Sequence, residues 1–247
     1  MRRIEMQPAM SEAVTSEIRG AILDGTLAPG TRIKQEALAA ELHVSRAPIR
    51  HALMVLKREG FVQTPRHRGT IVAPLDPLFI SDIYDLREAI EGYAVAKLAT
   101  RARFDPAPLH ETVTAGRKAV ASGDLLRIIE LDLAFHMGLY DALGNQPLRN
   151  VMAAQWWHFR RAMAATLSIG TYRKRVWNEH AAILKAIAAG QPGRAHALSI
   201  AHTRTAREVL LGKLKQVLTK RDLARRAGHA RRDRIRRSLA RERAAGA

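Results

Sequence analysis

The stretch LHVSRAPIRHAL, residues 42–53, decides the expected fold of the first third of the chain. Residues 43–44 predict a tight connection, and Ser45 after them is a residue type that favours the N-cap of a helix. Pro48 then falls at the third helical position, where its missing N–H costs no hydrogen bond. Apolar residues recur at helical spacing through this segment: Ile49, Ala52, Leu53 and Leu56. We therefore expect a helix with one buried face that ends at Gly60.

Helix-forming segments precede this stretch, and strand-forming segments follow it. Residues 9–24 and 35–41 carry apolar side chains at helical spacing, which predicts two further helices. Residues 61–64 and 70–73 are β-type runs on either side of a basic, turn-forming segment, so they predict a β-hairpin. Three helices followed by a basic hairpin are typical of a winged helix-turn-helix, which we expect over residues 1–73.

The helix that begins after Ser45 is the expected recognition helix, because the second helix of this motif enters the major groove with its N-terminus first. Arg46 and Arg50, with Ala47 between them, project from its first two turns, and guanidinium groups can bind guanine O6 and N7 in pairs. Ser45 and the helix N-terminus can hold a phosphate. Exposed arginines often only solvate a helix face, but their combination with the turn and the hairpin favours DNA. On the hairpin we expect contacts with the DNA backbone or minor groove from Arg66, His67 and Arg68.

Taken together, these segments resemble the GntR family of transcription regulators. The resemblance rests on residues 32–39, 42–53, 59–62 and 68–70. It implies that Arg46 and Arg50 contact operator DNA and that Gly69 of the wing does so too. The chain departs from the family at Ala37, where many members have a DNA-contacting arginine. Residues 33–35 also lack the proline that is common before this helix.

The rest of the chain predicts a helical bundle. Two prolines within residues 74–77 favour an extended linker. Beyond it, glycine and proline breaks separate helical segments near residues 78–101, 106–121, 125–143, 147–167, 174–189 and 193–218. We expect an all-α bundle of six or seven helices over residues 78–218, which makes the fold mainly α. Residues 219–247 are rich in Arg and Ala and poor in large apolar residues, so they predict a basic tail that builds no core.

The charge of the chain indicates a polyanionic partner. The 247 residues include 41 Lys and Arg against 23 Asp and Glu, a net charge of +18. Residues 213–247 alone hold 13 Lys and Arg against 3 Asp and Glu. Cysteine is absent, which excludes disulfides and thiolate metal sites and suits the cytoplasm. With no apolar run long enough for a signal peptide or a membrane span, we expect a cytoplasmic protein without a membrane partner.

Four ionisable residues on apolar stripes predict a metal site. Asp132 and His136 are four residues apart on one expected helix, so they face the same way. His180 and His202 lie on apolar stripes of two other expected helices. Buried polar groups need partners, and one divalent metal would satisfy all four. Nitrogen and carboxylate ligands suit Zn²⁺, and also Ni²⁺, Mn²⁺ or Fe²⁺. The alternative is a set of core histidines that only form hydrogen bonds.

The same segment resembles the FCD ligand-binding domain, which follows the winged helix in the FadR-type subfamily of GntR regulators. The match covers about residues 78–212. It rests on residues 132–136 and 144–148 and on the segments around His180 and His202. The resemblance implies that a metal is bound by Asp132, His136, His180 and His202, and from the ligand types we expect Zn²⁺ in the first place.

Residues 86–98 resemble the first helix of that domain and place Arg87 beside an apolar stripe that includes Leu86. An arginine near a metal suits a small organic acid, because the metal takes one carboxylate oxygen and the arginine binds the other end. We therefore expect Arg87 to bind the effector. The alternative is a purely structural ion pair with Glu91, four residues further on.

Trp156 and Trp157 are adjacent, and neighbours on a helix point about 100° apart. The two side chains therefore cannot both face the same core. Plain packing is the simplest interpretation, and a place in the ligand pocket or at a dimer interface is the alternative.

The expected function is that of a ligand-responsive transcription regulator, more specifically a repressor. It would bind a near-palindromic operator as a homodimer. One alternative is a metalloenzyme that uses the Asp/His cluster, although four protein ligands leave little open coordination and no hydrolase motif is present. The other is a non-specific nucleic-acid-binding protein driven by the basic tail.

Overall fold

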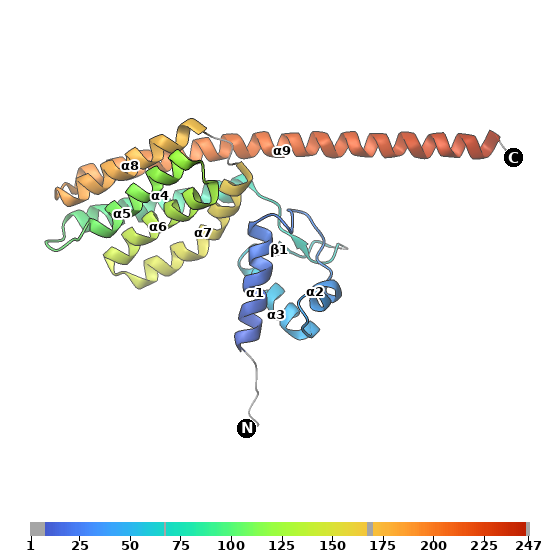
Figure 1. Cartoon of the computed structure of the whole chain (residues 1–247), viewed down its shortest axis with the longest axis horizontal. Coiled ribbons are helices and arrows are strands. Elements are labelled where there is room, and N and C mark those ends of the chain that lie inside the picture. The colour runs from blue at the N-terminus through green and yellow to red at the C-terminus, as the bar shows by residue number, and fades with distance from the viewer. Residues whose placement is uncertain (1–7, 67, 167–169, 246–247) are drawn as a thin grey trace, which may run out of the picture.

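The computed structural model describes residues 8–66, 68–166 and 170–245, with side chains described for residues 9–66, 68–164 and 174–220. The chain is mainly helical (Figure 1). Within the described residues, three helices and a two-stranded wing form the N-terminal part, and six helices form the C-terminal part. The predicted fold class is confirmed, with six helices in the bundle.

The N-terminal part is built on α1 (Pro8–Leu23), α2 (Gln35–Glu41) and α3 (Arg46–Arg58), close to the predicted segments. Their apolar faces meet in one small core. Its most buried members include Ile18, Ile49, Ala52, Leu56 and Phe61. The helical spacing in the sequence therefore correctly gave the buried face of α3.

The turn between α2 and α3 is tight. His43 adopts φ 52°, a left-handed conformation that is uncommon outside glycine, and the Val44 N–H donates to the carbonyl of Ala39 at 3.0 Å. Ser45 occupies the N-cap position with extended backbone, as expected. Its hydroxyl, however, accepts no capping hydrogen bond, so Ser45 marks the helix start without stabilising it through its side chain.

The wing consists of β1 (Val62–Gln63) and β2 (Ile71–Val72), which pair antiparallel with Val62 opposite Val72. Both strands are shorter than the predicted runs. A further antiparallel bridge joins Arg32 to Ile71, and the Ile33 N–H donates to the Thr70 carbonyl at 2.9 Å. A single bridging residue leaves no alternating pattern, so this pairing could not be predicted from the sequence.

The C-terminal part contains α4 (Pro77–Ala99), α5 (Ala107–Ser122), α6 (Leu125–Leu143), α7 (Gln146–Thr166), α8 (Gly170–Ala188) and α9 (Pro192–Ala245). Pro77, expected in the linker, is the first residue of α4, which Asp76 caps by accepting from the Leu78 N–H at 2.9 Å. The last helix runs far beyond its predicted end at residue 218. The prediction stopped where large apolar residues become scarce, but Arg and Ala are themselves strong helix formers.

The close packing of α5 against α8 depends on one glycine. A Cβ at Gly116 of α5 would lie 2.3 Å from the ring of Trp177 on α8. Trp177 is among the largest fully buried side chains, at 1% exposure. The two helices can approach this closely only because residue 116 has no side chain. Within the described chain, no helix combines the length and the apolar character needed to cross a membrane.

Candidate nucleic-acid interface and metal centre

The first turns of α3 form an exposed basic surface. Ser45, Arg46, Ala47 and Arg50 are all exposed. On the opposite side of the same helix, Ile49 is completely buried in the N-terminal core. The helix is therefore anchored by its apolar face and presents its arginine-bearing N-terminus outward, as a groove-binding helix must.

Arg46 has a partner that the sequence analysis missed. Its Nη2 lies 3.0 Å from Oε1 of Glu36 on α2, and the two side chains are 67% and 68% exposed. An ion pair this exposed contributes about 0–1 kcal/mol, so a base or phosphate can replace it. Ala37, where an arginine was expected, is exposed beside Glu36.

The wing adds further cations beside α3. Arg66, Arg68 and Gly69 are exposed, while His67 lies outside the described residues. Gly69 adopts φ 66°, and a Cβ there would lie 3.4 Å from the guanidinium of Arg32. Arg32 thus lies against the tip of the wing, and its bridge to β2 brings it there. Arg32 is a basic residue of this surface that the sequence pattern did not single out.

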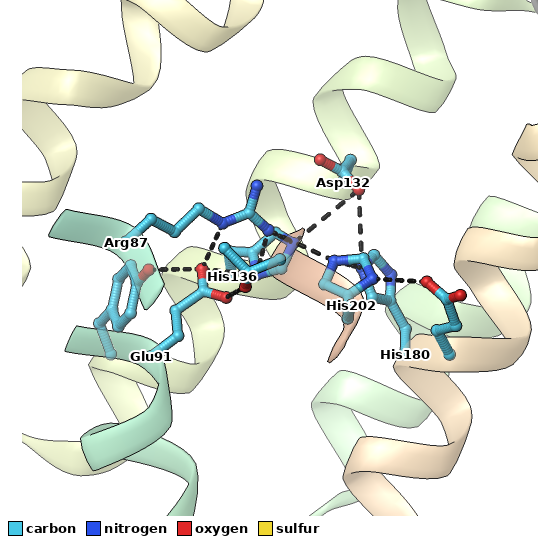
Figure 2. Close-up of polar contacts among 9 residues, drawn as sticks. Arg87, Glu91, Asp132, His136, His180 and His202 are labelled. Atoms are coloured by element: carbon cyan, nitrogen blue, oxygen red, sulfur yellow. Dashed lines mark hydrogen bonds and ion pairs between the residues drawn. The ribbon is translucent and has the colours of Figure 1, made fainter. Parts of the chain in front are cut away.

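The four predicted metal ligands come together inside the bundle (Figure 2). Asp132 and His136 lie on α6, His180 on α8 and His202 on α9, and all four are buried. The three histidines offer ligand nitrogens that lie within 4.8 Å of one another. His180 Nε2 is 3.3 Å from His202 Nε2, and Oδ1 of Asp132 is 3.6 Å from His180 Nε2 and 3.9 Å from His136 Nε2.

Two carboxylates behind the cluster orient two of its rings. Nδ1 of His136 lies 2.9 Å from Oε1 of Glu91, and Nδ1 of His202 lies 2.8 Å from Oε2 of Glu179. Each ring can donate its Nδ1–H to a carboxylate and turn the lone pair of Nε2 toward the other ligands. Metal-binding histidines usually have such a carboxylate partner. Of these two carboxylates, only Glu91 could be noticed in the sequence, through its spacing from Arg87.

His180 is held by aromatic packing instead. Its ring stacks on Phe135 with centroids 4.0 Å apart and meets the edge of Trp177 at 5.0 Å. Its Nδ1 has no hydrogen-bond partner among the described residues. Burial, followed by the neighbouring His202 and His136, holds the pKa of His180 well below its ordinary value. The ring is therefore neutral at physiological pH, which is the form that binds metals.

Arg87 points into the bundle, whereas Leu86, which was expected in the core stripe, is 37% exposed. The Nε–H of Arg87 donates to Glu91 at 2.8 Å, and Nη2 lies 2.5 Å from His136 Nε2 and 3.4 Å from His202 Nε2. Burial alone would raise the pKa of Glu91, but the charge of Arg87, together with the hydrogen bond and electrostatic contribution of His136, outweighs it and holds that pKa below its ordinary value. The Arg87–Glu91 pair is thus a fixed, ionised part of the site.

The donor set fits a divalent metal. Two ligand atoms of one tetrahedral Zn²⁺ lie about 3.3 Å apart, given bond lengths near 2.0–2.1 Å. The 3.3 Å between His180 Nε2 and His202 Nε2 matches that spacing, and the Asp132 oxygen is somewhat more distant. Three imidazole nitrogens and one carboxylate are also the ligand types that zinc and similar ions prefer.

Helix α7 connects this cluster to the N-terminal part through two adjacent residues. The ring of Trp156 stacks on His136 with centroids 5.1 Å apart, and the Arg87 guanidinium lies 4.9 Å from its centre. Trp157 instead packs against the N-terminal core, where the guanidinium of Arg19 lies 5.5 Å from its ring. The two tryptophans therefore face two different parts of the molecule.

Residues 158 and 161 of α7 also contact the N-terminal part. His158 stacks on Phe61 at 5.3 Å and meets Phe79 edge-on at 4.9 Å. Arg161 donates to the carbonyl of Ala73, the residue before the linker, at 2.6 Å. Burial, with a contribution from Arg161, lowers the pKa of His158 to about 4. A Cβ at Gly60 would lie 3.2 Å from the His158 ring, which shows how closely the two parts approach.

Comparison with known proteins gives two family matches that together span most of the chain. The model of the bacterial regulatory proteins of the gntR family matches residues 10–72, and the model of the FCD domain matches residues 82–205. The chain is 30% identical over 213 residues to the HTH-type transcriptional regulator LutR of Bacillus subtilis, an alignment that covers 77% of this chain and 96% of LutR.

Two further comparisons agree with these matches. Over 92 residues, the chain is 38% identical to the gluconate operon transcriptional repressor of Bacillus licheniformis, covering 37% of each protein. A solved GntR regulator from Rhodococcus sp. RHA1 has the same fold, with a TM-score of 0.70 at 24% identity, over 83% of this chain and 98% of that one.

Proposed function

Since the chain belongs to the GntR family of regulators with an FCD domain, and is a DNA-binding transcription regulator rather than an enzyme, we propose that a small organic acid bound beside a metal in its bundle controls its operator affinity. The observation that carries the proposal is the convergence of Asp132, three buried histidines and Arg87 on one point. A bound metal would supply a Lewis-acidic position for a carboxylate oxygen.

Charge balance inside the bundle favours an anionic effector. The pairs Arg87–Glu91 and Arg175–Glu179 are each neutral overall, and Asp132 contributes one negative charge. A divalent ion would leave this buried group with a net charge of +1, and an uncompensated buried charge is costly. A monocarboxylate would restore neutrality, with Arg87 positioned by Glu91 to contact it. A surface hollow of about 310 Å³ between α8 and α9 reaches His202 and Glu179 at the edge of the cluster.

We place the coupling between effector and DNA in α7. An effector that displaces Arg87 or His136 also changes the packing of Trp156, because both lie against its ring. Trp157, His158 and Arg161 on the same helix contact the N-terminal part, up to the residue that precedes the linker. A shift of α7 would therefore move the winged helix. Such a response requires that the effector bind the DNA-competent and incompetent arrangements with different affinity.

The DNA-reading part of the proposal comprises Ser45, Arg46, Ala47 and Arg50 of α3 and the wing residues 66–69. We divide the chain into a DNA-binding domain (1–73), a linker (74–77), a metal and effector domain (78–218) and a tail (219–247). We propose that it acts as a homodimer, because one winged helix reads few base pairs and two half-sites multiply specificity. We further propose repression, the activity stated for the similar gluconate operon repressor.

The test starts from sequences that the full chain selects from a randomised DNA pool. Arg50→Ala should cost about 1–3 kcal/mol per half-site and relax the preference over random DNA. Arg58→Ala, an exposed arginine in the last turn of the same helix, is the matched control and should leave the preference intact. If Arg50→Ala leaves the preference unchanged, α3 does not read the operator. Sedimentation as a monomer with and without the selected DNA would contradict the homodimer.

The effector is tested on zinc-loaded protein with a panel of mono-, di- and hydroxycarboxylates. An acid that raises the melting temperature and also changes affinity for the selected DNA supports the proposal. Arg87→Gln should abolish both effects. If no acid of the panel changes the melting temperature and the DNA affinity, there is no organic-acid site at Arg87. The same conclusion follows if Arg87→Gln responds like the parent.

A further inference from the structure

The last helix continues long after its packing against the bundle has ended. Leu210 and Leu214 are buried, and among the side chains that the structure describes, which end at residue 220, Leu218 is the last apolar one that packs against the core. The helix nevertheless runs on to Ala245, which adds about 40 Å at 1.5 Å per residue. Figure 1 shows this extension as one straight rod that projects clear of the bundle and of the N-terminal part. The FCD match ends much earlier, at residue 205.

The composition of the extension excludes several partners. Residues 219–247 contain 10 Arg and 1 Lys against 3 Asp and Glu, and their large apolar residues are only Leu223, Ile235 and Leu239. A coiled coil with a second copy needs apolar residues at every a and d position of the heptad. Stable binding in a membrane surface needs a broad apolar face. Neither pattern is present, whereas cations of this density match a phosphate backbone.

The arginine positions are also ordered along the helix. At 3.6 residues per turn, five of them fall within an arc of about 60°. We call these five positions the arginine stripe: Arg221, Arg225, Arg232, Arg236 and Arg243. They span about 33 Å of helix. The other five arginines, which serve below as the control set, lie on the opposite side of the helix over a wider arc of about 140°: Arg226, Arg231, Arg234, Arg237 and Arg241.

We propose that residues 219–245 form a second DNA-binding element, whose arginine stripe binds backbone phosphates of the duplex that the winged helix holds. The proposal rests on the DNA-binding activity of the family and on neither the metal nor the effector. Guanidinium groups bind phosphate oxygens in pairs, which suits the tenfold excess of Arg over Lys in this segment. The element reads no bases, so it adds affinity without sequence preference.

The experiment compares two variants of the full chain with equal net charge. One changes the arginine stripe to Gln at all five positions, and the other changes the control set to Gln. Glutamine keeps a good helix propensity, and circular dichroism checks that both variants stay helical. The probe is a 40-base-pair random-sequence duplex, and the measurement is the slope of log affinity against log salt concentration by fluorescence anisotropy.

Each released counterion contributes about 0.9 to that slope, so loss of five phosphate contacts should flatten it by about 4 to 5. Between 50 and 200 mM salt, the parent should then lose roughly 500-fold more affinity than the stripe variant. The control set should change the slope by less than half as much. Equal slopes for the two variants would overturn the proposal. A stripe variant whose slope equals the parent's would overturn it as well.

A vesicle arm separates DNA from a lipid surface. Vesicles of phosphatidylcholine and phosphatidylserine at 7:3 should bind the parent no better than they bind the stripe variant. Stripe-dependent vesicle binding with unchanged DNA slopes would assign the tail to membranes and overturn the proposal. The test uses a random-sequence duplex and needs no operator. It therefore still works if the winged helix selects no sequence, a result that would refute the proposed function alone.

Discussion

The Nδ1 atom of His136 lies 2.9 Å from Oε1 of Glu91, and both side chains are 1% exposed. The same carboxylate oxygen accepts from Arg87 at 2.8 Å and from the hydroxyl of Tyr140 at 2.7 Å. Glu91 therefore neutralises the buried cation and orients the histidine with one group. A residue that no ligand pattern singles out thus holds two predicted site residues in place.

Glu91→Gln should destabilise the fold by about 3–5 kcal/mol, because it leaves the charge of Arg87 buried without a partner. The double variant Arg87→Gln/Glu91→Gln should lose less stability than Glu91→Gln alone. Denaturant unfolding in the presence of a chelator measures both. Glu130→Gln, which breaks an exposed pair with Arg127, is the control and should change stability by less than about 1 kcal/mol. A Glu91→Gln variant as stable as this control would contradict the assignment.

His180→Ala/His202→Ala should abolish stoichiometric metal binding, because it removes two of the four donors. Metal content after dialysis measures this directly. The variant should keep its affinity for the selected DNA if it folds, and it should lose the response to the effector. His110→Ala, at an exposed position of α5, should retain the full metal content. Stoichiometric metal in the double variant would place the site elsewhere.

His158 should make folding sensitive to mild acid. Burial lowers its pKa to about 4 in the folded protein, against 6.5 for an ordinary histidine. The folded state therefore disfavours the proton, so this contribution is fully present above pH 6.5 and is lost as the pH falls toward 4. Between pH 7 and 4.5 it amounts to about 2–3 kcal/mol.

His158→Phe, which keeps an aromatic ring against Phe61 and Phe79, should remove that contribution. The free energy of unfolding of parent and variant at the two pH values measures it as a difference, in which all other titrating groups cancel. Arg161 is the charged side chain that faces His158 and reinforces the effect. Equal losses for the two proteins would show that His158 does not titrate in this way.

Gly116→Ala should cost about 1–3 kcal/mol, because the new methyl group overlaps the ring of Trp177 at 2.3 Å. Trp177 contacts His180, so metal affinity should fall as well. Gly212→Ala is the matched control: a Cβ there meets nothing within 4 Å, and alanine in a helix should stabilise by up to about 1 kcal/mol. Thermal unfolding and zinc titration measure both effects. A Gly116→Ala variant that gains stability would contradict the close packing.

Local patterns in the sequence determined most of the secondary structure. The spacing of Ile49, Ala52, Leu53 and Leu56 gave the buried face of α3, because a single helical stripe meets a single core there. The same logic placed the four metal-site residues on inward stripes. It failed at residues 86–87, because α4 is packed by α6, α7, α8 and α9 and so has no single buried side. Periodicity then cannot say which residue turns inward.

Only the tertiary structure decided how distant residues meet. The sequence placed Trp156 and Trp157 about 100° apart, but not one against His136 and the other against the N-terminal core. It likewise gave no sign that Glu179 supports His202, since that contact depends on how α8 and α9 pack. Helix formation is governed by neighbours within four residues, which the sequence displays directly. Contacts between helices depend on their relative position and rotation, which only the packed core fixes.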